Sequence, residues 1–346
     1  MFNIIYKITS PSVVEEFIDI VDYTENHVLV KVDTMAICKA DIRYFLGNRE
    51  QSVLNHKYPL SPIHEAVGVV LKDPTGTYKK GDKVILVPNS IKEELCISCP
   101  HTRCDRADLG NNYCPHALFR SSSTDGFMRQ FYACLPSELV KYDSKIPAET
   151  AVFAELLSVG VAALRRINFS EVKSLALFGD GIMAYIVYLV LVKNHPDIKV
   201  TVFGKNKDKL KEFDKAITTT YEEYRGEKFD TLIECVGGKF SEDAINQMIS
   251  LSLVGADLIL MGVSENNVGI NTRVILEKGL SLKGITRSSK DDFVKVSEML
   301  NDSYLQFKLE KMVISTTTIN SINDIYKVFD LEINNRTIIG KNLLKY

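Results

Sequence analysis

The chain has 346 residues, of which 45% are hydrophobic and 25% charged, enough apolar sequence for two ordinary folded domains. Its 42 lysines and arginines nearly balance 44 aspartates and glutamates, so the formal charge of -2 gives no reason to expect broad binding to nucleic acid or to an anionic membrane. The first residues lack the features of a secretory signal, and the longest apolar run, 182–192, is too short to span a bilayer. We therefore expect a cytoplasmic protein with reduced cysteines.

The first part of the chain, up to about residue 150, predicts a mostly antiparallel β domain. Short runs rich in β-branched residues lie at 27–37, 66–71 and 82–88. Glycine, proline and aspartate separate these runs and favour turns between them. The pattern is typical of strands that pair through short connections rather than through crossover helices.

Four residues in this part and just beyond it suggest one metal site: Cys38, His64, Glu65 and Glu155. Thiolate, imidazole and carboxylate groups are ligands that hold Zn²⁺ and leave one position for a substrate. Each residue alone also has an ordinary explanation, such as a core thiol, a hydrogen-bonded core histidine or a surface carboxylate. If the four converge on one ion, the chain is an enzyme.

A second cluster of cysteines predicts a structural zinc site. Its members are Cys96, Cys99, Cys104 and Cys114. Structural Zn²⁺ prefers four thiolates, and Cys-x-x-Cys is the usual first pair. Two alternatives remain open: a lobe without metal, or a site in which His101 or His116 replaces a thiolate.

The chain changes character near residue 150, where apolar strands begin to alternate with helical stretches. The strands are expected at 175–179, 200–204, 231–237 and 258–263, and a helix with a late strand at 271–284. Strands spaced in this way need crossover helices, which give a parallel, doubly wound sheet. The fold class is therefore α/β.

The first turn of this second domain carries a dinucleotide-binding pattern. Gly179, Gly181 and Ala184 form Gly-x-Gly-x-x-Ala directly after an apolar strand and before an apolar helix. The first glycine permits a tight turn, the second lets a pyrophosphate approach the backbone, and the small third residue lets helix pack on strand. An ordinary glycine-rich turn is the alternative, but the flanking strand and helix favour a cofactor.

The end of the second strand indicates which dinucleotide binds. An NAD-specific domain carries an acidic residue there for the ribose 2′-hydroxyl. This chain has Gly204, followed by Lys205, Lys207 and Lys209. The absence of a carboxylate and the presence of cations favour NADP(H) over NAD(H). The alternative is a solvated lysine cluster on a surface loop, which would have the same sequence.

Four motifs occur in an order that resembles the zinc-dependent medium-chain dehydrogenase/reductase family. They are Cys-x-x-Asp at Cys38, His-Glu at His64, a glutamate before Leu-Leu-Ser-Val at Glu155, and the glycine turn at Gly179. The resemblance covers nearly the whole chain. Within the family the chain is similar to the branch of ribitol-5-phosphate 2-dehydrogenases, on the segments ICKADIRYF, PLSPIHEAVG, STDGFMRQF, ELLSVG, FGDG, VFGK, ECVGGK, LMGVSE and NTRVILEKGLSL.

The resemblance implies the domain organisation. A GroES-like, mostly β catalytic domain would comprise residues 1–150 together with a returning segment, 290–346. A Rossmann domain would be inserted at 151–289, and the active cleft would lie between the two.

The resemblance also implies roles for single residues. Cys38, His64 and Glu65 would be zinc ligands, and Glu155 would be a further ligand or a partner to bound water. Asp41 matches a family aspartate whose carboxylate would orient a ligand histidine by accepting the N–H of its ring. Gly237, Gly262 and Arg287 would join the glycine turn and the lysines Lys205 and Lys209 in binding the cofactor.

Residue 40 departs from the family. Many members have serine or threonine there, and its hydroxyl begins a proton relay, whereas this chain has Ala40. The proton would then come from water, from the region of Glu155 or from Tyr44, which matches a tyrosine near the substrate in polyol dehydrogenases.

The implied reaction is hydride transfer from NADPH to C2 of D-ribulose 5-phosphate, with zinc polarising the carbonyl. The substrate phosphate needs cations, for which the candidates are Arg43, Arg49, Arg120, Arg273 and Arg287. A surface ion pair is the ordinary explanation for any one of them. The alternatives are another polyol or polyol-phosphate dehydrogenase, or a non-catalytic dinucleotide-binding module.

The resemblance implies two protein partners. An edge strand of the nucleotide domain often pairs between subunits in this family, so we expect a homodimer. Relatives of this branch work beside a cytidylyltransferase that makes CDP-ribitol for teichoic-acid or capsule synthesis, which implies such a partner here.

Overall fold

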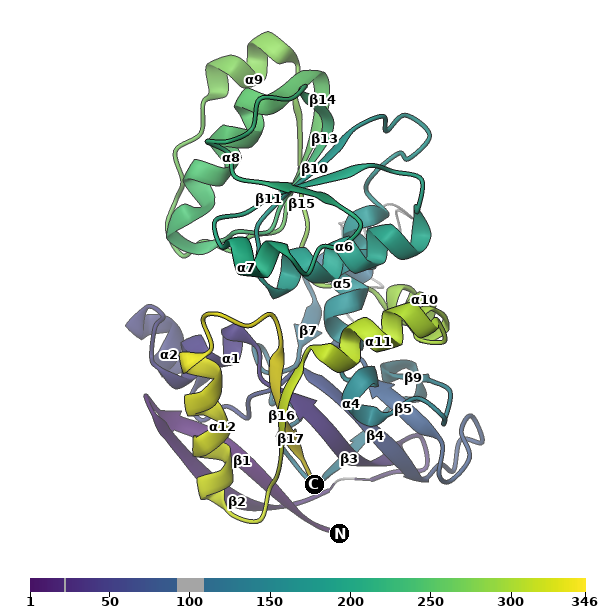
Figure 1. Cartoon of the computed structure of the whole chain (residues 1–346). Helices are drawn as coiled ribbons and strands as arrows, with labels where there is room; N and C mark the ends of the chain where they lie inside the picture. The colour runs from purple at the N-terminus through teal and green to yellow at the C-terminus, as the bar shows by residue number, and fades with distance from the viewer. Residues whose placement is uncertain (22, 92–108) are drawn as a thin grey trace.

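The computed structural model describes residues 1–21, 23–91 and 109–346. Two large β-sheets dominate these residues, one in each half of the molecule, and a group of helices lies between them (Figure 1). The lower sheet in Figure 1 combines strands from the N-terminal and C-terminal parts of the chain, and the upper sheet takes its strands from the middle. The fold is mixed α/β, as the sequence predicts.

The lower sheet is mostly antiparallel. In the described part of the chain its order is β16-β17-β3-β4-β5-β9, and β8 also pairs with β3. β3 is buried along most of its length because it has partners on both edges, while β16 and β17 run parallel to each other. The strands are β3 (Val28–Ala36), β4 (Glu65–Lys72), β5 (Lys83–Leu86), β8 (Phe131–Cys134), β9 (Leu139–Lys141), β16 (Val313–Thr318) and β17 (Lys341–Lys345).

The upper sheet is parallel and doubly wound. Among the described strands the order is β12-β11-β10-β13-β14-β15, and every neighbouring pair is parallel. β10 and β11 are buried throughout, which is why they appear in the sequence as uninterrupted apolar runs. The strand order reverses between β10 and β13, and ligands bind at such a switch point. The strands are β10 (Leu175–Phe178), β11 (Val200–Phe203), β12 (Ile217–Thr219), β13 (Phe229–Glu234), β14 (Ser252–Leu260) and β15 (Ser281–Gly284).

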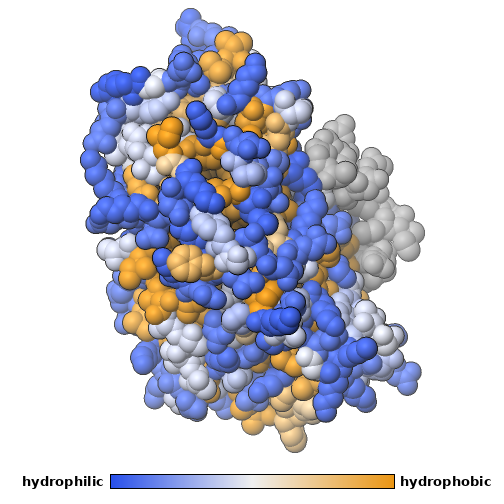
Figure 2. All heavy atoms as spheres, turned by 45° about the vertical axis from the view of Figure 1, so that its right-hand side comes forward, coloured by the Kyte–Doolittle hydropathy of each residue, from blue (hydrophilic) through white to orange (hydrophobic). Residues whose placement is uncertain are grey.

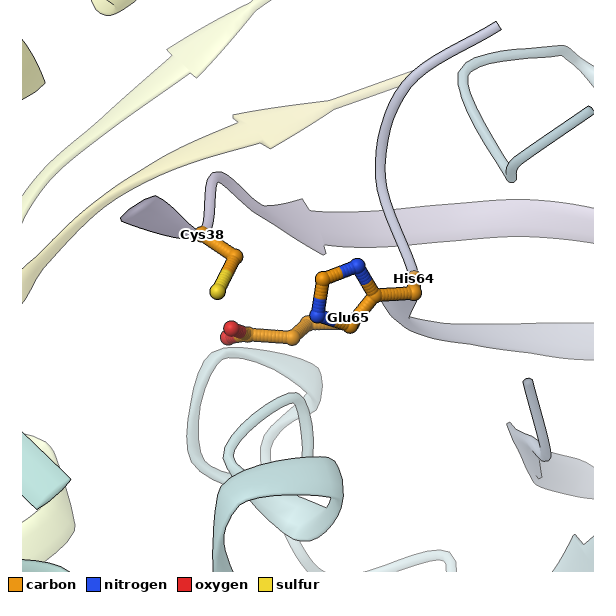
Figure 3. Close-up of side chains that lie close together, drawn as sticks. All are labelled: Cys38, His64 and Glu65. Carbon is orange, nitrogen blue, oxygen red and sulfur yellow. The ribbon is translucent and has the colours of Figure 1, made fainter. Parts of the chain in front are cut away.

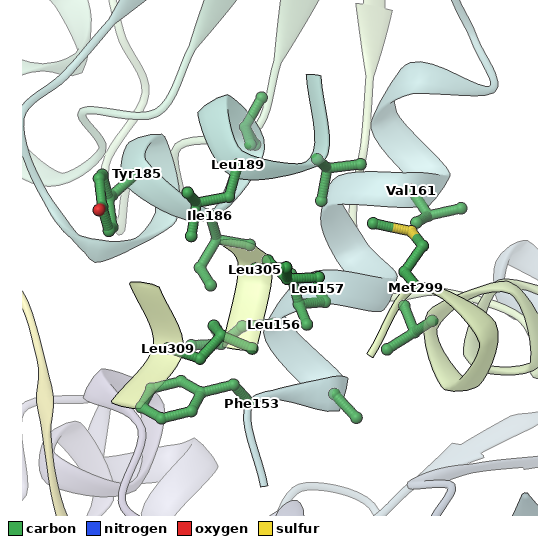
Figure 4. Close-up of a cluster of buried hydrophobic side chains, with 14 of the residues drawn as sticks. Phe153, Leu156, Leu157, Val161, Tyr185, Ile186, Leu189, Met299, Leu305 and Leu309 are labelled. Carbon is green, nitrogen blue, oxygen red and sulfur yellow. The ribbon is translucent and has the colours of Figure 1, made fainter. Parts of the chain in front are cut away.

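A layer of helices joins the two sheets through one apolar cluster (Figure 4). The helices are α5 (Ala154–Leu164), α6 (Ile182–Asn194), α10 (Lys290–Met299) and α11 (Ser303–Lys311). The central part of α6 is apolar around its whole circumference and is buried on all sides. Phe153 and Leu157 meet Ile186 and Leu309 in this cluster, which also includes residues of both sheets.

The remaining elements flank these layers. β1 and β2 form an antiparallel ribbon, β6 pairs with β7, and α12 packs beside β17. Their bounds are β1 (Phe2–Ser10), β2 (Val13–Ile20), α1 (Lys39–Phe45), α2 (Gln51–Lys57), β6 (Asn89–Ile91), η1 (Asn111–Tyr113), β7 (Ala117–Phe119), η2 (Pro136–Glu138), α4 (Ala148–Ala151), α7 (Lys207–Leu210), η3 (Gly238–Phe240), α8 (Ser241–Leu251), α9 (Thr272–Lys278) and α12 (Ile322–Asn334).

Each predicted run overlaps an observed strand, although β14 begins at Ser252, well before the predicted start at residue 258. The chain leaves the lower sheet after β9, builds the upper sheet, and returns to pair β17 with β3. This path is compatible with a nucleotide domain inserted into a catalytic domain. The division at residues 150 and 290 stays a prediction.

No helix among the described residues is both long and apolar enough to cross a membrane. On the face that Figure 2 shows, hydrophilic residues dominate and apolar residues form separate patches.

Candidate active site

Three of the predicted ligands meet where β3 and β4 lie side by side. Cys38 precedes the first turn of α1, directly after β3, and His64 and Glu65 lie at the start of β4. Antiparallel pairing places Glu65 opposite Ala36, which brings both segments to the same end of the sheet. One ligand atom from each of Cys38, His64 and Glu65 lies within 4.8 Å of the others, and the side chains point toward one another (Figure 3).

The chemistry of this group fits a zinc ion. The donors are a sulfur, an imidazole nitrogen and a carboxylate, and Oε2 of Glu65 is buried with no hydrogen-bond partner among the described residues. Burial disfavours the charged imidazole and lowers the pKa of His64. The electrostatic effects of Cys38, Asp41 and Glu155 are larger in sum, and they raise this pKa to about 10. Acidic groups therefore surround the imidazole, and such an arrangement favours a cation beside them.

Lys341 is a member of the site that the sequence pattern does not predict. It comes from β17, and its Nζ donates to Oε1 of Glu65 at 2.7 Å and to the Ile37 carbonyl at 2.8 Å. Both charged side chains are almost fully buried. Burial alone would lower the pKa of Lys341, but Glu65 and Cys38 outweigh burial and raise it. In the sequence, the feature that could have indicated this role is a lysine at the start of a short, partly apolar strand.

Asp41 has a different role from the predicted one. Its carboxylate accepts from the backbone N–H of Cys38 at 2.9 Å and from that of Ile63 at 2.9 Å, so its oxygens hold the two segments that carry the ligands. The His64 ring instead shares a hydrogen bond with Ser121, with Nδ1 and Oγ 2.7 Å apart. The reason is positional: at the third residue of α1, Asp41 turns back toward the start of its own helix.

Glu155 lies at the first turn of α5 and is buried near the other three. Burial raises the pKa of Glu155, and the charges of His64 and Lys341 only partly offset this effect. Glu155 is not within the 4.8 Å group, so its part in binding a metal stays a prediction.

An aromatic and cationic wall extends from the metal group toward the other domain. The His64 ring contacts the ring of Phe119, with centroids 5.0 Å apart. The guanidinium of Arg287, which follows β15, lies 4.8 Å from the centre of the same Phe119 ring. Arg49 lies over the ring of Tyr44 at 5.2 Å. Residues of both domains therefore form the surroundings of the ligands.

The five candidate arginines occupy three kinds of environment. Arg43 and Arg49 both pair with Glu265, in the loop after β14. Arg287 lies in the wall described above, whereas Arg120 is mostly buried and pairs with Glu138. Arg43, Arg49, Arg120 and Arg287 therefore remain candidates for binding the substrate phosphate.

Arg273 lies elsewhere. Its side chain on α9 is 87% exposed and pairs with Glu277 one turn along the same helix. Figure 1 shows α9 at the end of the nucleotide domain that is farthest from the lower sheet. This position contradicts a role for Arg273 in binding the substrate phosphate.

The predicted cofactor turn lies beside a cavity of about 320 Å³ at the carboxyl ends of β10, β11 and β13. Gly179 has φ +131°, and an added Cβ would contact the Cys235 carbonyl and Ala184 at 3.2–3.3 Å, so the position requires glycine. Gly181 precedes α6, whose N-terminus faces this region. The cavity is lined by residues that include Gly179, Gly181, Gly204, Lys205, Phe240 and Gln247.

Asp180 organises the loop that follows β11. Its Oδ2 accepts from the backbone N–H of Lys205 at 2.7 Å and of Asn206 at 2.8 Å. A Cβ added at Gly204 would lie 2.8 Å from the Cβ of Asp180. An acidic residue at position 204, as in an NAD-specific site, would therefore collide with Asp180.

The predicted lysines separate in the structure. Lys205 lines the cavity, and its Nζ lies 4.6 Å from the centre of the Phe240 ring. Lys209 instead lines a different depression, beside Tyr185 and Glu212. Lys209 is not among the residues that line the cofactor cavity, so its part in binding the cofactor stays a prediction.

Glu234 ties the loops after β13 and β14 together, a function that sequence reasoning missed. Its fully buried carboxylate accepts from the backbone N–H groups of Val236, Gly237 and Gly262, each at 2.8 Å. A Cβ at Gly262 would lie only 2.2 Å from this carboxylate. Gly237 and Gly262 thus shape the edge of the sheet near the cofactor cavity. In the sequence, a glutamate at the end of a buried apolar strand was the feature that could have indicated this role of Glu234.

The second cysteine cluster falls mostly outside the described residues. Cys96, Cys99 and Cys104, with His101, belong to the undescribed segment, whereas Cys114 is described and buried. The structural zinc stays a prediction.

Comparisons with known proteins agree with this geometry. Residues 24–144 match the family described as the alcohol dehydrogenase GroES-like domain. Ribulose-5-phosphate reductase 1 of Staphylococcus aureus is 35% identical to this chain over 356 residues, spanning 100% of the chain and 99% of the relative. The ribulose-5-phosphate reductase of Streptococcus pneumoniae is 35% identical over 346 residues, spanning 96% of the chain and 95% of the relative.

A solved structure extends the similarity to three dimensions. S. aureus TarJ in complex with NADPH superposes with a TM-score of 0.84 at 33% sequence identity, covering 100% of this chain and 99% of that one.

Proposed function

Since the chain belongs to the zinc-type medium-chain dehydrogenase/reductase family and, within it, to the ribulose-5-phosphate reductases, we propose that it reduces D-ribulose 5-phosphate to D-ribitol 5-phosphate with NADPH. The observation that carries the proposal is the meeting of Cys38, His64 and Glu65 within 4.8 Å. A dinucleotide cavity at the edge of the parallel sheet supplies the second requirement of hydride transfer.

The residues of the site support this reaction by position and charge. Cys38, His64 and Glu65 would hold a zinc ion, which supplies electrophilic polarisation of a carbonyl when bound. Asp41 keeps the two ligand-bearing segments in register, and Ser121 fixes the orientation of the His64 ring. The cofactor supplies the hydride, and the protein aligns its reactive carbon with C2 of the ketose.

Protonation of the developing alkoxide cannot begin at residue 40, because alanine has no hydroxyl. We propose that Tyr44 takes this part. It lies on α1, the helix that follows Cys38, and the cation Arg49 lies over its ring.

NADPH is the cofactor that the loop after β11 supports. Gly204 leaves no carboxylate for the ribose 2′-hydroxyl, and Lys205 brings a cation to the cavity. We further propose one catalytic zinc at Cys38, His64 and Glu65, with Glu155 beside it, and a structural zinc at Cys96, Cys99, Cys104 and Cys114.

An NADPH oxidation assay across ketoses and their phosphates tests the function. We expect the highest kcat/KM with D-ribulose 5-phosphate, and a preference for NADPH over NADH of at least about tenfold, because a contact with a charged 2′-phosphate contributes about 1.5–3 kcal/mol. A preference for NADH would refute the cofactor assignment. Higher kcat/KM with unphosphorylated ketoses would indicate a polyol dehydrogenase instead.

The free edge of the upper sheet supports a homodimer. Among the described strands β15 ends the sheet, and Val254 and Leu276 near this region are 82% and 81% exposed. We expect Leu276→Asp combined with Val254→Asp to convert a dimer to a monomer in light scattering after size exclusion, because each places an unpaired charge in an apolar contact. Phe2→Asp, at a residue 77% exposed on the β1–β2 ribbon, serves as the control and should leave the mass unchanged.

The product is a polyol phosphate, which a nucleotidyltransferase can couple to a nucleotide. We propose that a cytidylyltransferase follows in the synthesis of CDP-ribitol for teichoic acid or capsule, and that both proteins act in the cytoplasm.

A further inference from the structure

Two arginines of the catalytic domain converge on one carboxylate of the nucleotide domain. Nη1 of Arg43 lies 2.6 Å from Oε1 of Glu265, and Nη1 of Arg49 lies 3.0 Å from each oxygen of the same carboxylate. The arginine side chains are only 26% and 22% exposed, while that of Glu265 is 43% exposed. Two guanidinium groups therefore share one monoanion, and positive charge remains in excess.

The hydrogen-bonding capacity of these arginines is also incompletely used. Nε of Arg43 and Nε of Arg49 are both buried without a partner among the described residues. Arg287, in the wall described above, is a further cation of the site and lies 4.8 Å from the centre of the Phe119 ring. Within the described part of the chain no carboxylate pairs with Arg287. The cluster thus has unused donors and unbalanced charge, which is the character of an anion-binding site.

The cluster lies at a suitable reach from the metal ligands. Cys38 precedes α1 and Arg43 lies on it, and five residues of helix span about 7.5 Å. The wall from His64 through Phe119 to Arg287 begins at the same ligands, and Arg49 lies over Tyr44 of the helix that follows Cys38. In a 2-ketose 5-phosphate, three carbon atoms separate the carbonyl carbon from the phosphate ester oxygen. A carbonyl near Cys38 and His64 would therefore place its phosphate near Arg43.

We propose that Arg43 and Arg49 bind the phosphate of the substrate, and that Glu265 occupies this site until the phosphate displaces it. The inference rests on the proposed function, since it names the phosphate subsite of that reaction. A phosphate dianion has more charge and more acceptor oxygens than a carboxylate, so it competes well for two guanidinium forks. An unphosphorylated ketose has no group that displaces Glu265. The internal carboxylate thus selects for phosphorylated substrates.

The arginines are tested by comparing Arg49→Met with Arg273→Met. Both remove an arginine that pairs with a glutamate, but Arg273 lies on the distant helix α9. We expect Arg49→Met to raise KM for D-ribulose 5-phosphate by about ten- to hundredfold, because hydrogen bonds between charged groups are lost. It should also abolish competitive inhibition by inorganic phosphate. Arg273→Met should change neither quantity.

Glu265 is tested by comparing Glu265→Gln with Glu277→Gln. Removing the internal competitor should tighten inhibition by inorganic phosphate and lower KM about two- to fivefold, as expected for loss of a partly exposed ion pair. Glu277→Gln should have no such effect. A contact that merely ties the domains together would give weaker or unchanged phosphate binding in Glu265→Gln, which would overturn the inference.

The outcomes separate the inference from the proposed function. If the wild-type enzyme reduces D-ribulose 5-phosphate while Arg49→Met and Arg43→Met keep its KM, the phosphate subsite lies elsewhere and the function stands. If no ketose phosphate is reduced, the function fails, and the effect of inorganic phosphate on the unfolding temperature of wild type and Glu265→Gln still decides whether the site binds the anion. If Arg49→Met folds poorly, Arg49→Lys replaces it in the test. Lysine keeps the charge without the two-pronged guanidinium, so we expect a KM above that of the wild type but below that expected for Arg49→Met.

Discussion

Replacing Cys38 by serine should lower kcat/KM for D-ribulose 5-phosphate by at least about a thousandfold, because polarisation of the carbonyl contributes several kcal/mol. A hydroxyl is a much poorer zinc ligand than a thiolate, so the metal content should fall by one ion per chain. Steady-state kinetics and metal analysis of the same preparation measure both effects.

Cys134→Ser is the matched control for this substitution. Cys134 is a buried thiol in β8 of the same domain, where it packs in the core of the lower sheet. This variant should lose some stability and keep both its zinc and its activity. Full activity in Cys38→Ser protein that has lost its zinc would refute the metal mechanism.

Replacing Lys341 by methionine should lower the free energy of unfolding by about 3–5 kcal/mol, because Glu65 would be left as a buried charge without its partner. The effect should be larger in protein treated with a chelator than in zinc-loaded protein, since a bound cation would also compensate Glu65. Chemical denaturation of both forms measures the difference.

Two further variants separate charge from packing at this position. Lys345→Met removes a lysine from the same strand, but its pair with Glu149 is about one third exposed and should contribute less than about 1 kcal/mol. Adding Glu65→Gln to Lys341→Met removes the orphan charge and should recover part of the lost stability without restoring activity. Equal losses for Lys341→Met and Lys345→Met would contradict the role assigned to Lys341.

The strands and the meeting of three candidate metal ligands could be predicted for definite physical reasons. Parallel strands covered on both faces are apolar without interruption, so β10, β11 and β13 stand out in the sequence. Cys38, His64 and Glu65 follow or begin strands that pair as neighbours, and their residue types suit zinc. Local sequence therefore carried most of the information for these features.

The supporting residues could not be predicted because distant segments create their partnerships. Lys341 reaches Glu65 only after β17 has paired with β3, and Glu265 meets Arg43 only when the two domains are assembled. The contact between Ser121 and His64 was not predicted for the same reason. The family resemblance assigned Asp41 to a histidine, whereas its place in α1 directs its carboxylate to the backbone. Arg273 was grouped with the other arginines by its sequence segment, whereas the structure places it exposed on α9, paired with Glu277.

The helical layer restricts how substrate and cofactor enter. Its apolar cluster includes Ala36 and Val67 of the lower sheet and Leu175 and Leu177 of the upper one, so separating the sheets there would expose a continuous core to water. Elsewhere, where Arg43 and Arg49 meet Glu265, the two parts are joined by ion pairs that water can replace. We therefore expect the substrate to enter on the side of the ion pairs, where its phosphate exchanges with Glu265, and not through the apolar layer.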